Sequence, residues 1–241
     1  MIDYSVIIPS FNEETWLPKS LKALNEAMKK IDFLGEVIVV DNNSSDKTSK
    51  VAKEYGAKVV FEPVNQISRA RNKGGNIAKG KYLVFLDADT VLSKDLLQDA
   101  LKKLSTGTCC GGGVIVTMDK PIGFFAGTLM SLWTFASVKF SLAAGCFVFC
   151  LRQAFDDIGG FSEKVYASEE IWFSRNMFVW GKKRKMSFDI ITDHPVTTSN
   201  RRIENPIRAF LMVFVLILFP FGICFKSVCS LLWYNKEQKK I

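Results

Sequence analysis

The chemistry in this sequence starts from two aspartates, Asp87 and Asp89, which follow the apolar run YLVFL. Two carboxylates one residue apart repel each other, and both lose hydration where a packed strand excludes water. Alternate residues of a strand share a face, so the two aspartates predict an oxygen-ligand site for Mg²⁺ or Mn²⁺. The alternative is a strand end with two solvated acids, because a D-x-D pattern alone is weakly specific.

A third acid and a group of cations accompany this pair. Asp41 follows the apolar run EVIVV, a place where an acid can bind a base or a ribose in other α/β nucleotide sites. The segment SRARNKG supplies Arg69, Arg71 and Lys73 just before the D-x-D strand. Arg71 is the better candidate for reaching a base edge or a phosphate, whereas Lys73 fits a solvated helix face.

The elements that must position these residues alternate along the chain. Apolar runs without polar alternation occur at residues 4–10, 36–41, 57–61 and 81–87, and segments with helical spacing separate them. This pattern predicts an α/β fold with a mainly parallel sheet covered by helices on both faces. Ligands of such sheets bind at the carboxyl ends of the strands, where these three aspartates lie.

Composition narrows the range of partners. The 241 residues carry 32 Lys and Arg against 24 Asp and Glu, and the net charge of +8 suits phosphates, nucleic acid or acidic lipid. No nucleic-acid partner is expected, since the basic residues are not interleaved with aromatic residues in a recognisable module. The six cysteines lack the C-x-x-C spacing of a zinc site, which favours buried thiols in a reducing cytosol. No signal peptide is evident.

The end of the chain differs from the rest. Residues 209–225, AFLMVFVLILFPFGICF, contain no charge and reach the short end of a membrane span. We expect a hydrophobic membrane-associating segment with a basic tail at residues 206–241, which either spans the bilayer or lies on it. A buried C-terminal helix is the alternative. The apolar segment at residues 122–142 could likewise be a core helix or a surface that faces lipid.

Six segments occur in the order and spacing of the family 2 glycosyltransferases, which this chain resembles over about residues 3–190: VIIPSFNEE, VIVVDNNSSDKT, ARNKG, YLVFLDADT, IGGF and SEEIWFSR. The resemblance implies a GT-A fold with a Rossmann-like sheet, and transfer of a sugar from a nucleotide donor with inversion. We expect a GT-A domain at residues 1–205, with a nucleotide-binding half at 1–106 and an acceptor half at 107–205.

The resemblance also assigns residues to the nucleoside of the donor. Pro9, Phe11 and Glu13 would lie along the nucleoside. Asp41 and Arg71 would lie near the base.

A second set would hold the metal ion and the diphosphate. Asp87 would face the ribose or the metal, and Asp89 would bind the metal. His194, the only histidine, follows the acceptor segment where related enzymes sometimes supply a further metal ligand; a structural role is the alternative. Arg201 and Arg202 lie in TTSNRR, which resembles the mobile closing loop of the family, and would contact the diphosphate or anionic headgroups.

The motif SEEIWFSR carries the expected catalytic base. The family usually has Glu-Asp here, with the second acid as the base. In this sequence that position is Glu170, whose arm is one methylene longer, and Glu169 is the competing candidate. The base would accept the proton of the acceptor hydroxyl as it attacks the anomeric carbon, without a covalent intermediate.

Two other classes of enzyme fit less well. A sugar nucleotidyltransferase needs a basic, glycine-rich loop after the first strand, where this chain has the acidic PSFNEE, and a dinucleotide-dependent oxidoreductase needs G-x-G-x-x-G. We predict a metal-dependent transferase that moves one sugar from a UDP- or GDP-sugar to a lipid-linked or glycan acceptor at the cytoplasmic face of a membrane. The alternatives are a soluble or protein acceptor, and a non-catalytic, membrane-attached protein that binds nucleotide sugars.

Overall fold

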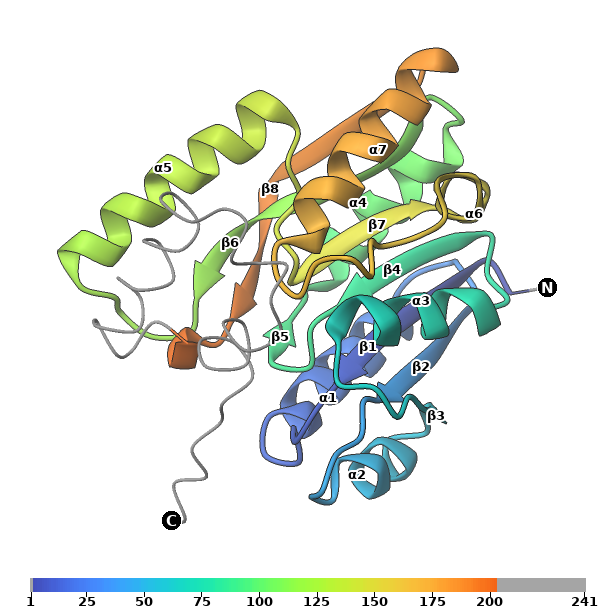
Figure 1. The fold of residues 1–241 in the computed structure, drawn as a ribbon, viewed down its shortest axis with the longest axis vertical. Coiled ribbons are helices and arrows are strands. Elements are labelled where there is room, and N and C mark those ends of the chain that lie inside the picture. The colour runs from blue at the N-terminus through green and yellow to red at the C-terminus, as the bar shows by residue number, and fades with distance from the viewer. Residues whose placement is uncertain (1, 203–241) are drawn as a thin grey trace.

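The structure of the protein, a computed structural model, describes residues 2–202, so the segment predicted to contact a membrane lies outside the described part. Figure 1 shows the arrangement of the elements. The helices are α1 (Leu17–Met28), α2 (Thr48–Glu54), α3 (Ile67–Ile77), α4 (Lys94–Ser105), α5 (Phe124–Phe140), α6 (Arg152–Ile158), α7 (Glu169–Lys183) and the 3-10 turn η1 (Asn200–Arg202). The strands are β1 (Tyr4–Ser10), β2 (Gly35–Asp41), β3 (Lys58–Phe61), β4 (Tyr82–Leu86), β5 (Thr90–Val91), β6 (Cys109–Met118), β7 (Phe147–Leu151) and β8 (Ser187–Thr198).

The strands form one sheet in the order β3-β2-β1-β4-β7-β6-β8-β5. β3, β2, β1 and β4 run parallel to their neighbours, which confirms the predicted sheet for the first half of the chain. β7 is antiparallel to both β4 and β6, β8 is parallel to β6, and β5 is antiparallel to β8. The complete sheet is therefore mixed, and its parallel part lies within residues 1–106, for which nucleotide binding stays a prediction.

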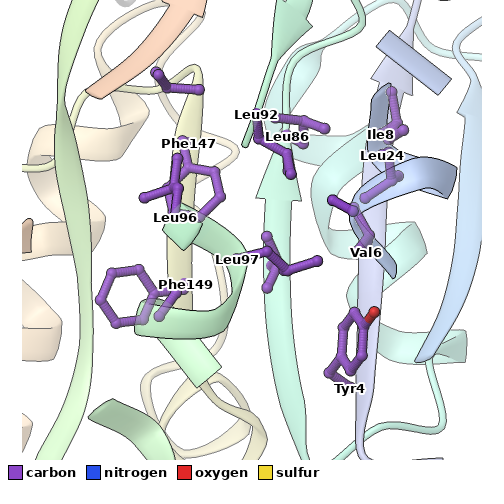
Figure 2. Packing of buried hydrophobic residues seen from close by; sticks show 14 of the residues in the cluster. Tyr4, Val6, Ile8, Leu24, Leu86, Leu92, Leu96, Leu97, Phe147 and Phe149 are labelled. Carbon is purple, nitrogen blue, oxygen red and sulfur yellow. The ribbon is translucent and has the colours of Figure 1, made fainter. Parts of the chain in front are cut away.

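Helices cover both faces of the sheet, which explains why its strands lack polar alternation. In β1, Val6 and Ile8 belong to a core formed with α1 and α4, whereas Ile7 belongs to a second core formed with α3, α6 and α7. Figure 2 shows the first core, in which Leu24 of α1 and Leu97 of α4 lie among the side chains of the sheet. Burial on both faces therefore fixes the strands whose ends carry the candidate site.

The strand β6 depends on glycine. A side chain at Gly112 would place its Cβ 1.9 Å from the carbonyl oxygen of Asp189, so only glycine permits the close pairing of β6 with β8. α5 connects β6 to β7 and lies beside β6 and β8, apart from the other helices (Figure 1). Across residues 2–202, every helix is too short or too polar to cross a membrane.

Candidate active site

The loops that follow β1 and β2 are joined by hydrogen bonds at the carboxyl edge of the sheet. Asn12 Oδ1 accepts a hydrogen bond from the backbone N–H of Ser45 at 2.8 Å. The backbone N–H of Glu13 donates to Thr48 Oγ1 at 2.7 Å. These contacts fix the loop that carries Glu13 before any ligand binds.

Asp41 is the last residue of β2 and is buried. Its carboxylate accepts hydrogen bonds from the backbone N–H of Ser44, at 2.9 Å, and from the hydroxyl of Ser49. These bonds hold the turn after β2, a local role that the sequence did not indicate.

Pro9 is buried within β1, and Phe11 is half-buried at the start of the next loop. Contacts of these residues with a nucleoside stay predictions.

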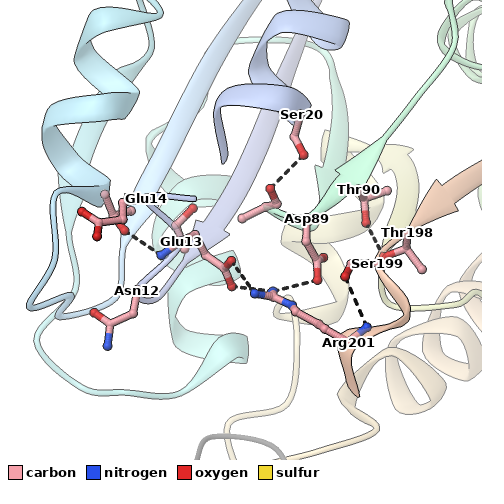
Figure 3. Close-up of polar contacts among 12 residues, drawn as sticks. Asn12, Glu13, Glu14, Ser20, Asp89, Thr90, Thr198, Ser199 and Arg201 are labelled. Carbon is pink, nitrogen blue, oxygen red and sulfur yellow. Dashed lines mark hydrogen bonds and ion pairs between the residues drawn. The ribbon is translucent and has the colours of Figure 1, made fainter. Parts of the chain in front are cut away.

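Arg201 is the cation that lies between the acids of two loops (Figure 3). Its guanidinium donates to both oxygens of Glu13, at 2.9 and 2.8 Å, and one nitrogen lies 2.7 Å from Asp89 Oδ2. The ring centre of Trp16 lies 5.4 Å from the guanidinium carbon. Burial would lower the pKa of Arg201, but the hydrogen bonds and charges of Glu13 and Asp89 outweigh burial and raise it. Two buried acids thus share one permanent cation.

A second arginine, Arg71 of α3, neutralises the other aspartate of the D-x-D pattern. Its side chain is 1% exposed and donates to Asp87 Oδ1 at 3.0 Å and to the carbonyl oxygen of Gly145 at 2.7 Å. It also pairs with Glu169 at the start of α7, and its guanidinium carbon lies 5.2 Å from the ring centre of Phe161. Burial lowers the pKa of Arg71, but the charges of these two acids more than compensate and raise it.

Glu170 follows Glu169 at the start of α7 and is half-buried. Burial and the neighbouring charge of Glu169 raise the pKa of Glu170 to about 8. A Cβ built on Gly145 would lie 3.5 Å from the carboxyl carbon of Glu170, so this carboxyl lies against the chain that leads from α5 to β7. A carboxyl whose pKa is close to neutral pH has the property required of a general base.

Asp87 and Asp89 follow the end of a strand, so strand periodicity alone does not decide whether they share a face. β4 ends at Leu86, and the chain turns over residues 87–89, so the alternation of a strand no longer applies there. Asp87 contacts Arg71 and Asp89 contacts Arg201. The two carboxylates therefore have different arginine partners.

The acids around Arg201 are compatible with a hard divalent cation. Within residues 2–202, no three His, Cys, Asp or Glu side chains lie close enough together to hold a metal ion by themselves. Glu13 and Asp89 nevertheless offer oxygens to one shared cation, which in this structure is a guanidinium. Mg²⁺ and Mn²⁺ commonly use one or two carboxylates and complete their shell with water and substrate phosphates. The donor set fits such an ion together with a diphosphate.

His194 lies in β8, and its predicted role as a metal ligand stays a prediction. Its Nε2 lies 3.6 Å from Asp99 Oδ2 of α4. Thr198, at the end of β8, pairs with Thr90 next to the D-x-D turn. β8 is irregular around His194, since Ile191 and Val196 pair with Val114 and Val116 of β6.

Arg71 is among the inward-facing residues of α3 and is held by two acids and a carbonyl group. Its predicted contact with a base or a phosphate stays a prediction. Arg71 is thus a positioning residue for Asp87 and Glu169 in this structure. The side chain of Arg202 lies outside the described part, so its predicted contact with a diphosphate stays a prediction.

Sequence reasoning missed two residues of the site. Trp16 follows the polar stretch NEET, and nothing nearby in the sequence indicates a contact with Arg201. Gly145 lies in the small-residue stretch AAGC, which is a usable signal because glycine before a strand often marks a close approach of another group. A Cβ at this position would lie 3.3 Å from Arg71 Nη2.

The sheet and its edge define an α/β protein with an acidic, arginine-bridged site at the ends of parallel strands. The chain belongs to glycosyl transferase family 2, whose family model matches residues 5–159. The predicted class of enzyme, a glycosyltransferase, is confirmed at the level of the family.

The chain is also similar to the following two relatives and one solved structure. It is 27% identical to glycosyltransferase AglE of Haloferax volcanii over 217 residues, 85% of this chain and 70% of that protein. It is 43% identical to dolichyl-phosphate beta-glucosyltransferase of Mus musculus over 98 residues, which are 35% of this chain and 30% of that protein. The mannosyltransferase PcManGT of Pyrobaculum calidifontis, solved with GDP-Man and Mn²⁺, has a TM-score of 0.66 and 20% identity, with 94% of this chain and 64% of that chain covered. This likeness shows the fold.

Proposed function

We propose that this protein is a metal-dependent, inverting glycosyltransferase that moves a single sugar from a nucleotide-sugar donor to an acceptor hydroxyl or phosphate. The observation that carries the proposal is the arrangement of charge at the edge of the sheet. Glu13 and Asp89 share the guanidinium of Arg201, while Glu170 has a raised pKa at the start of α7. One set of groups suits a diphosphate with its cation, and the other suits proton transfer.

The donor would be a UDP- or GDP-sugar bound at the ends of β1, β2 and β4. Asp89 and Glu13 would hold Mg²⁺ or Mn²⁺, which when bound would neutralise charge on the departing diphosphate. The guanidinium of Arg201 would turn from these acids to the phosphate oxygens, for which its planar fork is suited. GDP-Man and Mn²⁺ in the structure of PcManGT support this type of donor.

Glu170 would act as the general base. The acceptor hydroxyl would lose its proton to the carboxylate of Glu170 while its oxygen bonds to the anomeric carbon and the bond to the diphosphate breaks. Glu169 is held by the buried Arg71, which leaves Glu170 as the more accessible carboxylate of the two. This division of roles supports the second acid of the motif as the base.

The acceptor is proposed to be lipid-linked, and the protein to lie at the cytoplasmic face of a membrane. The apolar residues 206–241 and the name of the mouse relative, which acts on dolichyl phosphate, support this choice. A glycan acceptor, or a soluble or protein acceptor, would use the same donor site and the same base. A non-catalytic protein that binds nucleotide sugars is less favoured, because both the acids of the donor site and Glu170 are present.

A ligand screen followed by a transfer assay tests the proposal. Nucleotide sugars that bind the folded protein must raise its melting temperature by mass action, and we expect one of them to do so only with Mn²⁺ present. That donor should then transfer its sugar to a polyprenyl phosphate. Stabilisation without transfer to any acceptor would favour the non-catalytic alternative. Transfer to a water-soluble acceptor alone would exclude a lipid-linked acceptor.

A further inference from the structure

α5 turns a strongly apolar face to the solvent. Its outward-facing positions recur with helical spacing and include Phe124, Leu132, Phe135 and Phe140, which are 93, 60, 63 and 62% exposed. Single exposed apolar side chains are normal on a protein surface. Several large ones on one helix mark a binding surface.

Another helix of the same protein shows what a water-facing surface looks like here. α1 exposes Lys19, Lys22 and Glu26 on the face turned away from its core. α5 also lies at the surface of the protein (Figure 1). Its exposed positions carry aromatic and aliphatic side chains instead. The apolar face of α5 is therefore a property of this helix and not of the protein's surface in general.

The polar side chains on the outward face of α5 are satisfied within the helix. Thr128 Oγ1 donates to the carbonyl oxygen of Phe124 at 3.0 Å, and Ser131 Oγ donates to that of Gly127 at 3.0 Å. Hydroxyl groups bonded to their own helix can enter an apolar medium without leaving donors unmet. In water such hydrogen bonds add little stability, because water can replace them. The arrangement therefore fits an environment with few other hydrogen-bond partners.

The one charged side chain of α5 is basic. The sequence from Lys120 to Phe155 contains no acid. The ammonium group of Lys139 lies 5.3 Å from the ring centre of Phe135 and 5.8 Å from that of Phe140. A lysine on an apolar face can extend its charge to lipid headgroups while its stem stays among apolar groups. The combination fits an apolar layer beneath an anionic surface.

A shallow groove adjoins the same face. It lies between α5 and the chain after β6, has a volume of about 520 Å³, and is lined chiefly by Val116, Ile122, Gly127, Met130, Thr134 and Phe135. Most of this lining is apolar. A hydrocarbon chain would fill it better than water does.

Both ends of α5 are tied to the candidate active site. Before the helix, Asp119 Oδ1 accepts a hydrogen bond from the backbone N–H of Asn200 at 2.9 Å, next to Arg201. After the helix, the chain reaches Gly145, which lies against the carboxyl of Glu170. The apolar run at residues 209–225 follows soon after Arg201 in the sequence.

We propose that α5 docks on an anionic lipid bilayer and lies in its interfacial region. The inference rests on the proposed function in one respect, which is that the protein would bind a lipid-linked acceptor at this bilayer surface. It adds a second membrane contact, distinct from residues 206–241, at the helix that connects the donor and acceptor sides of the site. The partner is a bilayer surface with negative headgroups.

A local fluorescence measurement on the full chain tests this docking separately from any contact made by residues 206–241. p-Cyanophenylalanine would replace Phe135 in one protein and Phe61, which is 55% exposed on the edge strand β3, in a control. Vesicles of phosphatidylcholine and phosphatidylglycerol would carry nitroxide-labelled acyl chains. We expect quenching of the probe at position 135 and none at position 61. Bound protein without quenching at position 135 would overturn the proposal.

Substitutions give the second arm of the test. The combined change Phe124→Ser, Leu132→Ser and Phe135→Ser should weaken binding to these vesicles by about tenfold or more, whereas Phe61→Ser should not. Stabilisation by the nucleotide sugar should persist in the triple variant, which separates this test from that of the proposed function. Unchanged vesicle binding of the triple variant would refute the docking of α5 on a bilayer. If the unmodified protein self-associates without vesicles and the triple variant does not, the proposal would also be refuted, because the apolar face would then bind a second copy of the chain.

Discussion

The Asp89 carboxylate and the Arg201 guanidinium lie 2.7 Å apart, so a permanent cation already occupies the position that the proposed function gives to a divalent ion. The same guanidinium bonds both oxygens of Glu13. In the proposed function, a metal ion that uses Asp89 would have to break this ion pair. Binding of metal and donor would then be coupled to the release of Arg201.

This coupling predicts an unusual effect of removing a cation. Arg201→Met should raise the affinity for Mn²⁺ in the absence of nucleotide by about tenfold, since a charged hydrogen bond contributes about 1.5–3 kcal/mol that the metal no longer has to overcome. The affinity for the nucleotide sugar should fall. Free Mn²⁺ measured by electron paramagnetic resonance reports the first effect. Weaker Mn²⁺ binding in this variant, with Arg184→Met as the control, would contradict the competition.

The buried arginine predicts a large effect on stability. Arg71→Met leaves Asp87 and Glu169 without their cation in a buried site and should lower the free energy of unfolding by about 3–5 kcal/mol. Arg69→Met, two positions away on the same helix but with a 39% exposed side chain, should cost less than about 1 kcal/mol. Urea denaturation of both variants measures the difference. Equal losses would mean that the Arg71 network does not hold the start of α7.

Glu170 predicts the pH dependence of transfer. Glu170→Gln should lower kcat by about 10²–10⁴-fold while the donor still binds, because only the proton acceptor is lost. In the unmodified protein, kcat/KM should rise with pH and level off above the pKa of about 8. Steady-state rates across this range test both statements. Glu54→Gln, on the exposed surface of α2, is the control. Full activity of the Glu170→Gln variant would contradict Glu170 as the base and would leave Glu169 as the candidate.

The same carboxyl predicts a pH dependence of stability. Its pKa is raised from 4.5 to about 8 on folding, so the folded state binds this proton more tightly than the unfolded state does. The stabilisation is complete below pH 4.5 and is lost as the pH rises through about 8. Between about pH 5 and pH 8, the free energy of unfolding should therefore fall more in the unmodified protein than in Glu170→Gln. Parallel curves from urea denaturation would contradict the raised pKa.

Local patterns were sufficient to predict the parallel half of the sheet. β1, β2 and β4 are apolar on both faces because helices cover both, and this gives a signal in the sequence itself. The position of Asp41 at a strand end followed from the same runs. The antiparallel β7 was not predicted, because its direction depends on pairing with β4 and β6 and not on its own composition.

The charge network of the site was beyond local patterns. Arg71 and Glu169 are far apart in the sequence, and only the fold, which places α3 and α7 over the same core, brings them together. The contact of Arg201 with Asp89 depends on the path of β8 back to the D-x-D turn. The same strand carries His194, whose Nε2 lies 3.6 Å from Asp99 Oδ2 of α4.

The most direct test of the account is calorimetric titration of the nucleotide sugar found in the screen, with and without Mn²⁺, into the unmodified protein and into Asp89→Asn. The account predicts that Mn²⁺ strengthens donor binding to the unmodified protein, and that this gain disappears in Asp89→Asn while circular dichroism shows an unchanged fold. The same gain from Mn²⁺ in both proteins would contradict the central claim that the acid after β4 holds the cation of the donor's diphosphate.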